Sequence, residues 1–599
     1  MERKIFFIVL SLLLVLGFLV YGNSFKVPFH YDDRVLILEN ENLHSLERFF
    51  KKEFPSSNRP VLMLSFALNY SAGGVNPAGY HLVNLIIHIL TAFLIYLITL
   101  GLLLKKETEK NPDCFVVAIL ASLIFLIHPL ATESATYISS RSSLMSCFFY
   151  LLSLYFFVKG SAEDRESIVF SSACIFSFLM ALGSKEIAIT LPLITVLSDY
   201  YFISDGDRKK IFSNFRRFHL PLAISAIVVI LLKFSYAIRL ESPDRVERGF
   251  YSHILSTAYA LIFYLKKFFL PLNLNIDPDF KIFDSVFHSG IVVILFAALM
   301  LLITAVKLYP EKKIISFSII WFFITLSPHF LIRLRDIGAE RWLYLSLAGF
   351  GFFSAGLFVE LKNVFQKKGK NIFVGSILLI IFLFSATTIA RNKVWENGIS
   401  LWADAVKKSP NKFRPYNNLG EAYSAMGEID MALQEYEIAS RLNPMADRVH
   451  YNLGNAYSKK GEIDPAIASF TRATELNPSY AKAYNNLGSI YLNNGNLQKA
   501  EEMFLKTVKI LPDFKEAYNN LGNVYSEMGL SKEAISEYKK AIDINKYYDT
   551  PHYNLAREFY KSGSLEEAIK ELEIASKLSP KIEYSEKLHE LKNIRGMKN

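Results

Sequence analysis

The chain has 599 residues, of which 52% are hydrophobic, and a formal charge of +10; this length is too great for one ordinary domain. Residues 1 to about 390 form long apolar runs and the remainder is soluble in character, so one part is expected in lipid and the other in water. Most Lys and Arg of the first part lie in short loops, where they set membrane topology rather than indicate nucleic-acid binding. Cys114, Cys147 and Cys174 all lie in or beside apolar runs, and no disulfide framework or metal-spaced cysteine pair is evident.

The first apolar run, Ile5–Val20, follows a charged N-terminus like the core of a signal peptide, but no small-residue cleavage site comes after it. We expect a transmembrane helix instead, because about 20 apolar residues cross a bilayer and similar runs follow. A further segment, 253–270, contains Lys266 and Lys267 and is predicted to lie at the interface without crossing. The eleven predicted spans are 5–21, 82–104, 114–130, 138–158, 167–183, 187–203, 218–236, 286–306, 314–331, 342–360 and 372–390.

Basic loops orient these spans, because Lys and Arg favour the cytoplasmic side. The basic loops can all share that side only if segment 253–270 does not cross. The N-terminus is then inside, and the C-terminal part lies outside. The segments that are also expected outside are loop 22–81, links 131–137 and 184–186, and loop 332–341.

The first outer loop contains the motif His30-Tyr31-Asp32-Asp33-Arg34. Two adjacent carboxylates beside a transmembrane helix are costly to keep near lipid, which favours a functional role over a solvated turn. Adjacent side chains of an extended segment point to opposite faces. One carboxylate is therefore expected to face a substrate while Arg34 or another basic group holds the other.

Further polar groups interrupt the apolar runs on the outer side. Each could be a satisfied structural group, but together they gather at one face of the membrane. Several are cations, as expected for holding a phosphate at the membrane surface. They are Arg59, His81, Asn84, His88, His128, Glu133, Arg141, Lys185, Glu186, Arg333, Arg335, Asp336, Glu340 and Arg341.

This pattern fits transfer of a sugar from a polyprenyl-phosphate carrier. The leaving phosphate is already stable as an anion, whereas the acceptor hydroxyl needs a general base, which Asp32 or Asp33 would supply. Arg and Lys would stabilise the charge that gathers on the phosphate. One-step attack predicts inversion at the anomeric carbon. No compelling metal site is evident, although the acid pair could accept a divalent cation.

The C-terminal part is built from five repeats of 34 residues, the tetratricopeptide period. Aromatic, alanine and proline positions recur in register with an Asn-Leu-Gly motif, and Trp402, Ala405 and Pro410 indicate a preceding half-repeat. Stacked helical pairs give a concave face suited to an extended peptide, and a ladder of side-chain amides could hold a peptide backbone. Alternatively, Asn is simply common at this position. The five ladder residues are Asn418, Asn452, Asn486, Asn520 and Asn554.

In their order, these motifs resemble the transmembrane and tetratricopeptide-repeat-containing O-mannosyltransferases of glycosyltransferase superfamily C (GT-C), over nearly the whole chain. The matching stretches are Tyr31–Asp33, Asn58–Pro60, Asn76–Asn84, His128–Pro129 with Thr132–Glu133, Lys185–Glu186, Ala339–Arg341 with Leu343–Tyr344, and Arg391–Asn392 with Trp395. This chain has Ser140 before Arg141 where the family has a glycine, and its outer loops are short, which indicates a bacterial member.

The resemblance implies transfer of mannose from dolichyl phosphate to Ser or Thr hydroxyls of proteins, with Asp32 and Asp33 catalytic and the repeats binding the acceptor. In a bacterium the carrier would be undecaprenyl phosphate, the sugar need not be mannose, and the active site would face the periplasm from the inner membrane. The residues expected to bind the donor are Arg59, His128, Glu133, Arg141, Lys185, Glu186, Arg335, Glu340, Arg341 and Tyr344.

The predicted fold class is all-α, with a polytopic membrane domain of about eleven helices of GT-C type followed by a tetratricopeptide-repeat solenoid. The expected parts are the membrane domain 1–390, a junction and half-repeat 391–412, five repeats 413–582, and a helical cap 583–599. Two alternatives stay open: the same transfer to a glycan or lipid acceptor, and a non-enzymatic membrane scaffold whose repeats assemble proteins.

Overall fold

The computed structural model describes residues 2–104, 112–161, 167–205, 207–239, 248–334, 336–365 and 369–598. Within these ranges every regular element is a helix, as predicted. The chain divides into two compact units, Met1–Ser409 and Pro410–Asn599. The expected junction helix, α18 (Gly398–Lys408), lies in the first unit rather than with the repeats.

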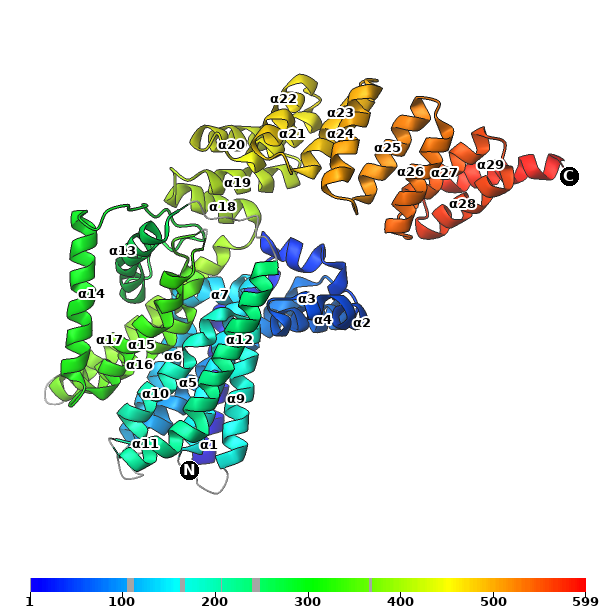
Figure 1. Ribbon diagram of the computed structural model, residues 1–599. Helices are drawn as coiled ribbons and strands as arrows, with labels where there is room; N and C mark the ends of the chain where they lie inside the picture. Colours follow the sequence, from blue (N-terminus) through cyan, green and yellow to red (C-terminus); the bar gives the residue numbers. More distant parts are fainter. Residues whose placement is uncertain are drawn as a thin grey trace. The chain divides into compact units, whose positions relative to one another are not determined.

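The first unit is a bundle of apolar helices (Figure 1). In the described residues, nine helical segments are long and apolar enough to cross a membrane. With a pair bent by 51° at His128 and the shorter helix α9, they correspond to the eleven predicted spans. The α-helices of these segments are α1 (Glu2–Tyr21), α5 (Pro77–Leu104), α6 (Pro112–Ile127), α8 (Arg141–Gly160), α9 (Ser167–Ser184), α10 (Leu191–Ser198), α12 (Leu220–Arg239), α14 (Ser289–Leu308), α15 (Lys313–Leu331), α16 (Tyr344–Phe365) and α17 (Lys370–Val394).

Helices α5, α6, α8 and α16 form the centre of the bundle, where Tyr96, Leu126, Leu154 and Leu347 are fully or almost fully buried. Helices α14 and α17 expose most of their apolar side chains, as expected for helices that face lipid. Helix α13 (Phe250–Phe269) carries Lys266 and Lys267 in its last turn and is not among the candidate spans of the described residues. That it does not cross stays a prediction.

The first outer loop is more ordered than the sequence indicated. It folds into short helices, of which α4 (Pro60–Gly73) is the longest, beginning with a proline at its first position. These helices and α7 (Thr132–Thr136) lie toward the end of the bundle opposite the N-terminus and α11 (Arg208–Asn214) (Figure 1).

The second unit consists of five antiparallel helix pairs and a capping helix. A glycine with positive φ ends the first helix of each pair, where a left-handed residue is needed. The pairs are α19 (Phe413–Ala425) with α20 (Ile429–Leu442), α21 (Asp447–Lys460) with α22 (Ile463–Leu476), α23 (Ala481–Asn493) with α24 (Leu497–Ile510), α25 (Lys515–Glu527) with α26 (Ser531–Ile544), and α27 (Asp549–Lys561) with α28 (Leu565–Leu578); α29 (Ile582–Lys598) is the cap.

The Asn-Leu-Gly glycine lets the two helices of a repeat approach closely. A Cβ on Gly522 would lie 2.5 Å from the Tyr538 ring, and one on Gly454 would lie 2.7 Å from the Phe470 ring. Any side chain at these positions would push the helices apart. The fifth repeat has Ala556 instead, which is also buried.

Candidate functional site

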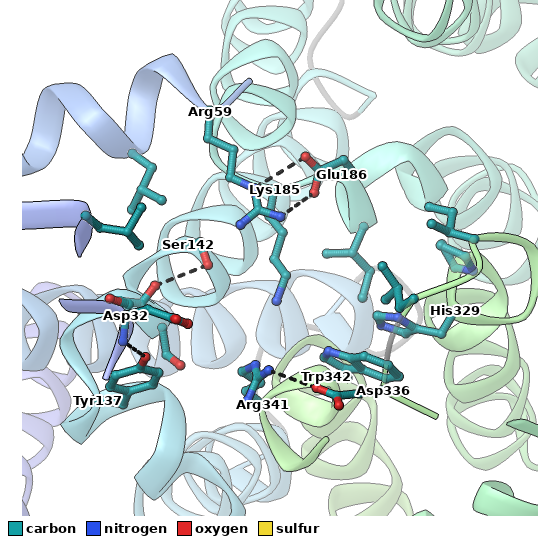
Figure 2. A pocket seen from close by; sticks show the side chains of 18 residues that line it. Asp32, Arg59, Tyr137, Ser142, Lys185, Glu186, His329, Asp336, Arg341 and Trp342 are labelled. Carbon is teal, nitrogen blue, oxygen red and sulfur yellow. Dashed lines mark hydrogen bonds and ion pairs between the residues drawn. The ribbon is translucent and has the colours of Figure 1, made fainter. Parts of the chain in front are cut away.

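A cavity of about 520 Å³ lies in the first unit among predicted site residues from five parts of the chain (Figure 2). It combines charged groups with an apolar wall that includes Ile187, Pro328 and Ile332. Its polar lining residues are Asp32, Arg59, Tyr137, Ser139, Ser140, Ser142, Lys185, Glu186, His329, Asp336, Arg341 and Trp342.

The acid pair lies in a tight turn, not in the extended segment that the sequence suggested. Tyr31 has a φ of 46°, a left-handed conformation that is strained for a bulky residue, and Asp32 and Asp33 open a short helical segment. The two carboxylates still diverge, because successive residues of a helix project about 100° apart. Asp32 is exposed and lines the cavity, whereas Asp33 is buried.

Asp33 holds the turn together. Its carboxylate accepts the backbone N–H of His30 at 2.9 Å and that of Ser139 at 2.7 Å, and also the Ser139 hydroxyl. The sequence predicted a basic partner such as Arg34; main-chain and hydroxyl donors fill this role instead. Burial raises the pKa of Asp33 to about 7 against the opposing effect of these hydrogen bonds. The backbone N–H of Asp32 donates to the Tyr137 hydroxyl at 3.1 Å.

Among the residues that the structure describes, three cations line the cavity with Asp32: Arg59, Lys185 and Arg341. The Arg59 guanidinium donates to both carboxylate oxygens of Glu186, at 3.3 Å and 3.0 Å, and Lys233 donates to the same carboxylate at 3.1 Å. Glu186 therefore sits between two cations and fixes the position of Arg59, which keeps further N–H groups for another acceptor.

Lys185 projects into the cavity between Asp32 and His329 (Figure 2). Its ammonium donates to the Ser143 hydroxyl at 2.7 Å. Burial, and then the neighbouring charges of Arg59 and Arg341, lower the pKa of Lys185 to about 7. An anion placed here would favour the protonated amine.

Arg341 is the third cation that lines the cavity. Its guanidinium donates to the buried carboxylate of Glu133 at 2.9 Å, and its backbone N–H donates to the other oxygen at 2.9 Å. Asp336 lies on its other side at 3.8 Å. Glu133 thus orients Arg341 without lining the cavity itself.

Besides Glu133, four of the described residues that were predicted to bind the donor do not line this cavity. The fully buried Arg141 donates to Asn84, Tyr80 and Ser65, which ties three helices together. His128 donates to the carbonyl oxygen of Phe268 at 2.9 Å.

The buried Tyr344 and Glu340 are also engaged in the interior of the unit. The Tyr344 hydroxyl donates to His88 at 2.6 Å, and Glu340 accepts the backbone N–H of Asn275 at 2.8 Å. These four side chains are engaged away from the cavity lining, and their direct contact with a phosphate stays a prediction. Arg335 lies outside the described residues.

Several cavity residues were not singled out from the sequence, among them Tyr137, Ser142, His329 and Trp342. His329 stacks on Trp342 with ring centroids 4.2 Å apart. Tyr137 is the last residue of the predicted link 131–137 and Ser142 follows five residues later, so proximity to that link was the available signal. Nothing in the sequence pairs His329, at the end of a span, with Trp342.

The asparagine ladder of the second unit joins neighbouring repeats. Each amide after the first donates to a residue of the repeat before it. Asn554, for example, donates to Asn519 at 3.0 Å and Asn523 at 3.1 Å. Because these donor groups are engaged inside the solenoid, the ladder would offer an acceptor peptide mainly its carbonyl oxygens.

Among the residues that the structure describes, no group of three or more His, Cys, Asp or Glu could hold a metal ion. A divalent cation at the acid pair stays a prediction.

The chain is similar to curated protein O-mannosyl-transferases. It is 26% identical over 455 residues to one from Caenorhabditis elegans, covering 73% of this chain and 63% of that protein. It is 23% identical over 473 residues to TMTC3 of Homo sapiens, covering 71% and 50%. The chain therefore spans about half to two thirds of the length of these relatives.

Family comparisons describe both units. Residues 56–269 match the family "GPI transamidase subunit PIG-U", residues 423–461 and 454–495 match "TPR repeat", and residues 479–546 match "Tetratricopeptide repeat". A solved structure of MamA is 32% identical over 25% of this chain and 86% of its own, with a TM-score of 0.24. The resemblance predicted from the motifs is confirmed: the homologues of this chain are protein O-mannosyl-transferases, and its C-terminal unit carries tetratricopeptide repeats.

Proposed function

We propose that this homologue of the protein O-mannosyl-transferases is an integral membrane glycosyltransferase that moves a sugar from a polyprenyl-phosphate carrier to hydroxyl groups of proteins. One observation carries the proposal: an exposed carboxylate, Asp32, shares a cavity with Arg59, Lys185 and Arg341. A phosphate needs such cations, and an acceptor hydroxyl needs such a base.

The three cations would bind the carrier phosphate. Arg59 and Arg341 are each held by a carboxylate, Glu186 and Glu133, so their N–H groups are oriented before a ligand arrives. Lys185 has a pKa of about 7 and is therefore close to half protonated at neutral pH. Binding of the phosphate would favour its protonated form, because a nearby anion stabilises the ammonium. The apolar wall of the cavity would accommodate the start of the polyprenyl chain.

Asp32 would act as the general base. The acceptor oxygen attacks the anomeric carbon and forms the new C–O bond, and its proton passes to the Asp32 carboxylate. The bond between the anomeric carbon and the phosphate oxygen breaks, and its electron pair stays on the phosphate, where the cations stabilise it. Attack from the face opposite the phosphate inverts the anomeric carbon. Asp33 would hold the turn and not meet the substrate, since it is buried and engaged by Ser139 and His30.

The basic loops support a cavity on the extracytoplasmic side, because the N-terminus and Arg208–Asn214 lie at the other end of the bundle (Figure 1). In a bacterium this side is the periplasm, the carrier undecaprenyl phosphate, and the sugar mannose or a similar hexose. The repeats would bind the protein acceptor, with the asparagine carbonyls as one set of contacts.

The proposal is tested with the purified full chain in lipid, a panel of polyprenyl-phosphate sugars and an unfolded protein acceptor. We expect at least one donor to give a Ser- or Thr-linked sugar with inverted anomeric configuration. Transfer only to a glycan or lipid would support the alternative acceptor class. Absence of transfer from every donor, with the chain folded, would leave the scaffold alternative.

A further inference from the structure

The turn that presents Asp32 is built on the junction between α17 and α18. His30 donates from Nε2 to the carbonyl oxygen of Trp395 at 2.8 Å. The Trp402 ring of α18 meets the ring of Tyr31, the strained residue of the turn, with centroids 5.8 Å apart. The turn and the junction are more than 360 residues apart in sequence.

Trp395 also reaches Asp32 through a side chain. Its fully buried indole stacks on Tyr137, with centroids 5.5 Å apart and an interplanar angle of 26°. Tyr137 in turn accepts the backbone N–H of Asp32. Trp395 therefore contacts two residues that support Asp32: His30, which begins the turn, and Tyr137, whose hydroxyl accepts the Asp32 amide.

The junction itself is fixed at its first end. Asn392 donates to the carbonyl oxygen of Val20 at 3.0 Å and accepts from Thr136 at 3.1 Å, which joins α17 to the end of α1 and to α7. Arg391 pairs with Asp404 of α18 at 2.6 Å.

The far end of α18 is fixed as well. Lys408 donates to the carbonyl oxygen of Leu274 at 2.6 Å, and Asn275 donates to Ser409 at 2.8 Å. Both ends of the junction are held to the membrane unit by hydrogen bonds, so the junction is a fixed part of that unit and not a flexible linker.

We infer that Trp395 is a positioning residue that acts on the transfer reaction through Asp32. The inference rests on the proposed role of Asp32 as base. Loss of the indole would leave a void beside Tyr137 and let the turn shift, and displacement of a base by about 1 Å costs about a hundredfold in rate. The junction between α17 and α18 thus supports the catalytic site without contacting the substrate.

The test uses the full chain and four variants: Trp395→Leu, Trp395→Phe, Asp32→Asn, and the double variant Asp32→Asn with Trp395→Leu. Trp395→Leu should lower kcat by about ten- to a hundredfold with donor affinity unchanged. It should not lower the residual rate of Asp32→Asn any further, because its effect passes through the carboxylate. Trp395→Phe should restore most of kcat, since the indole N–H of Trp395 has no hydrogen-bond partner among the described residues.

The matched control is Trp321→Leu, which removes an equally buried tryptophan from the bundle, where its N–H donates to the Leu345 carbonyl oxygen. It should lower thermal stability but leave the kcat of the folded protein unchanged. Hydrogen exchange of the Asp32 amide gives a readout without turnover: it should accelerate in Trp395→Leu and not in Trp321→Leu.

Two results would overturn the positioning role. One is an equal loss of rate from Trp395→Leu in the wild-type and Asp32→Asn backgrounds; the other is unchanged exchange at the Asp32 amide. Failure of the proposed function is distinguishable, because then the folded wild-type chain transfers no sugar. Failure of the proposed role of Asp32 is distinguishable too, because then Asp32→Asn transfers sugar at the wild-type rate.

Discussion

Arg341 donates hydrogen bonds to both carboxylate oxygens of Glu133, one from its backbone N–H and one from its guanidinium, each at 2.9 Å. These residues are 208 positions apart, and their contact joins the link between α6 and α8 to the loop before α16. The Glu133 side chain is almost completely buried, whereas the Arg341 side chain is 28% exposed and lines the cavity. The pair therefore orients a cation while keeping one of its faces available.

Removal of the cation from this pair should be costly for folding. Arg341→Ala leaves the Glu133 carboxylate buried without its charged partner, and we expect a loss of about 3–5 kcal/mol. Thermal unfolding in lipid nanodiscs measures this loss. The double variant Arg341→Ala with Glu133→Gln should recover part of it, because no buried charge is then unpaired. Equal stabilities of the single and double variants would contradict the assigned pairing.

Donor affinity should depend on the protonation of Lys185. The folded pKa of about 7 is depressed below the ordinary value, so the amine is increasingly neutral above pH 7. The donor phosphodiester keeps a constant charge in this range. We therefore expect donor affinity to fall, by up to about tenfold per pH unit, from about pH 7 to about pH 9. Calorimetric titration of the donor at several pH values measures the slope.

Lys185→Arg is the matched control, because its guanidinium stays charged throughout this range. Its donor affinity should be nearly independent of pH. A wild-type slope that persists unchanged in Lys185→Arg would show that another group carries the titration.

Asp33 should make the fold less stable as the pH rises. Its folded pKa of about 7 is raised above the ordinary value of 3.8, so the native state binds more protons than the unfolded state between these values. Its contribution is therefore fully present below the unfolded pKa and is lost as the pH rises through about 7. As the pH rises from about 4 to above 7, the melting temperature of the wild type should fall relative to that of Asp33→Asn. A difference that stays constant with pH would reject the raised pKa.

The asparagine ladder should act first on the stability of the repeats. Asn554→Ala removes two hydrogen bonds to the preceding repeat, and we expect a loss of about 1–3 kcal/mol. Asn418 is the matched control, because its buried side-chain N–H group has no partner among the described residues. Its replacement by Ala should cost less. Hydrogen exchange of the repeat helices measures both effects, whereas a similar rise in acceptor KM for both variants would favour direct peptide contact.

The spans and repeats could be predicted from the sequence because their signals are local. A run of apolar residues or a 34-residue period does not depend on distant contacts. The same reasoning identified Asp32, Arg59, Lys185 and Arg341, and all four line the same cavity. Their roles stay predictions until they are tested.

Long-range contacts explain what the sequence could not predict. Arg141 is polar and beside a span, like Arg341, but it meets Asn84 and Tyr80 in the interior rather than the cavity. Nothing near it in the sequence distinguishes the two arginines. The turn at Tyr31 was likewise hidden, because Ser139 and Trp395 impose it from far along the chain.

Donor binding and sugar transfer by Asp32→Asn, measured separately, test the central claim most directly. The donor affinity of Asp32→Asn should be close to that of the wild type. In a single-turnover experiment with donor already bound, its transfer rate should be reduced by about 10²- to 10⁴-fold. The exposed carboxylate of Asp279, outside the cavity, supplies the matched control Asp279→Asn, which should transfer normally. A transfer rate for Asp32→Asn equal to that of this control would contradict the assignment of Asp32 as the base.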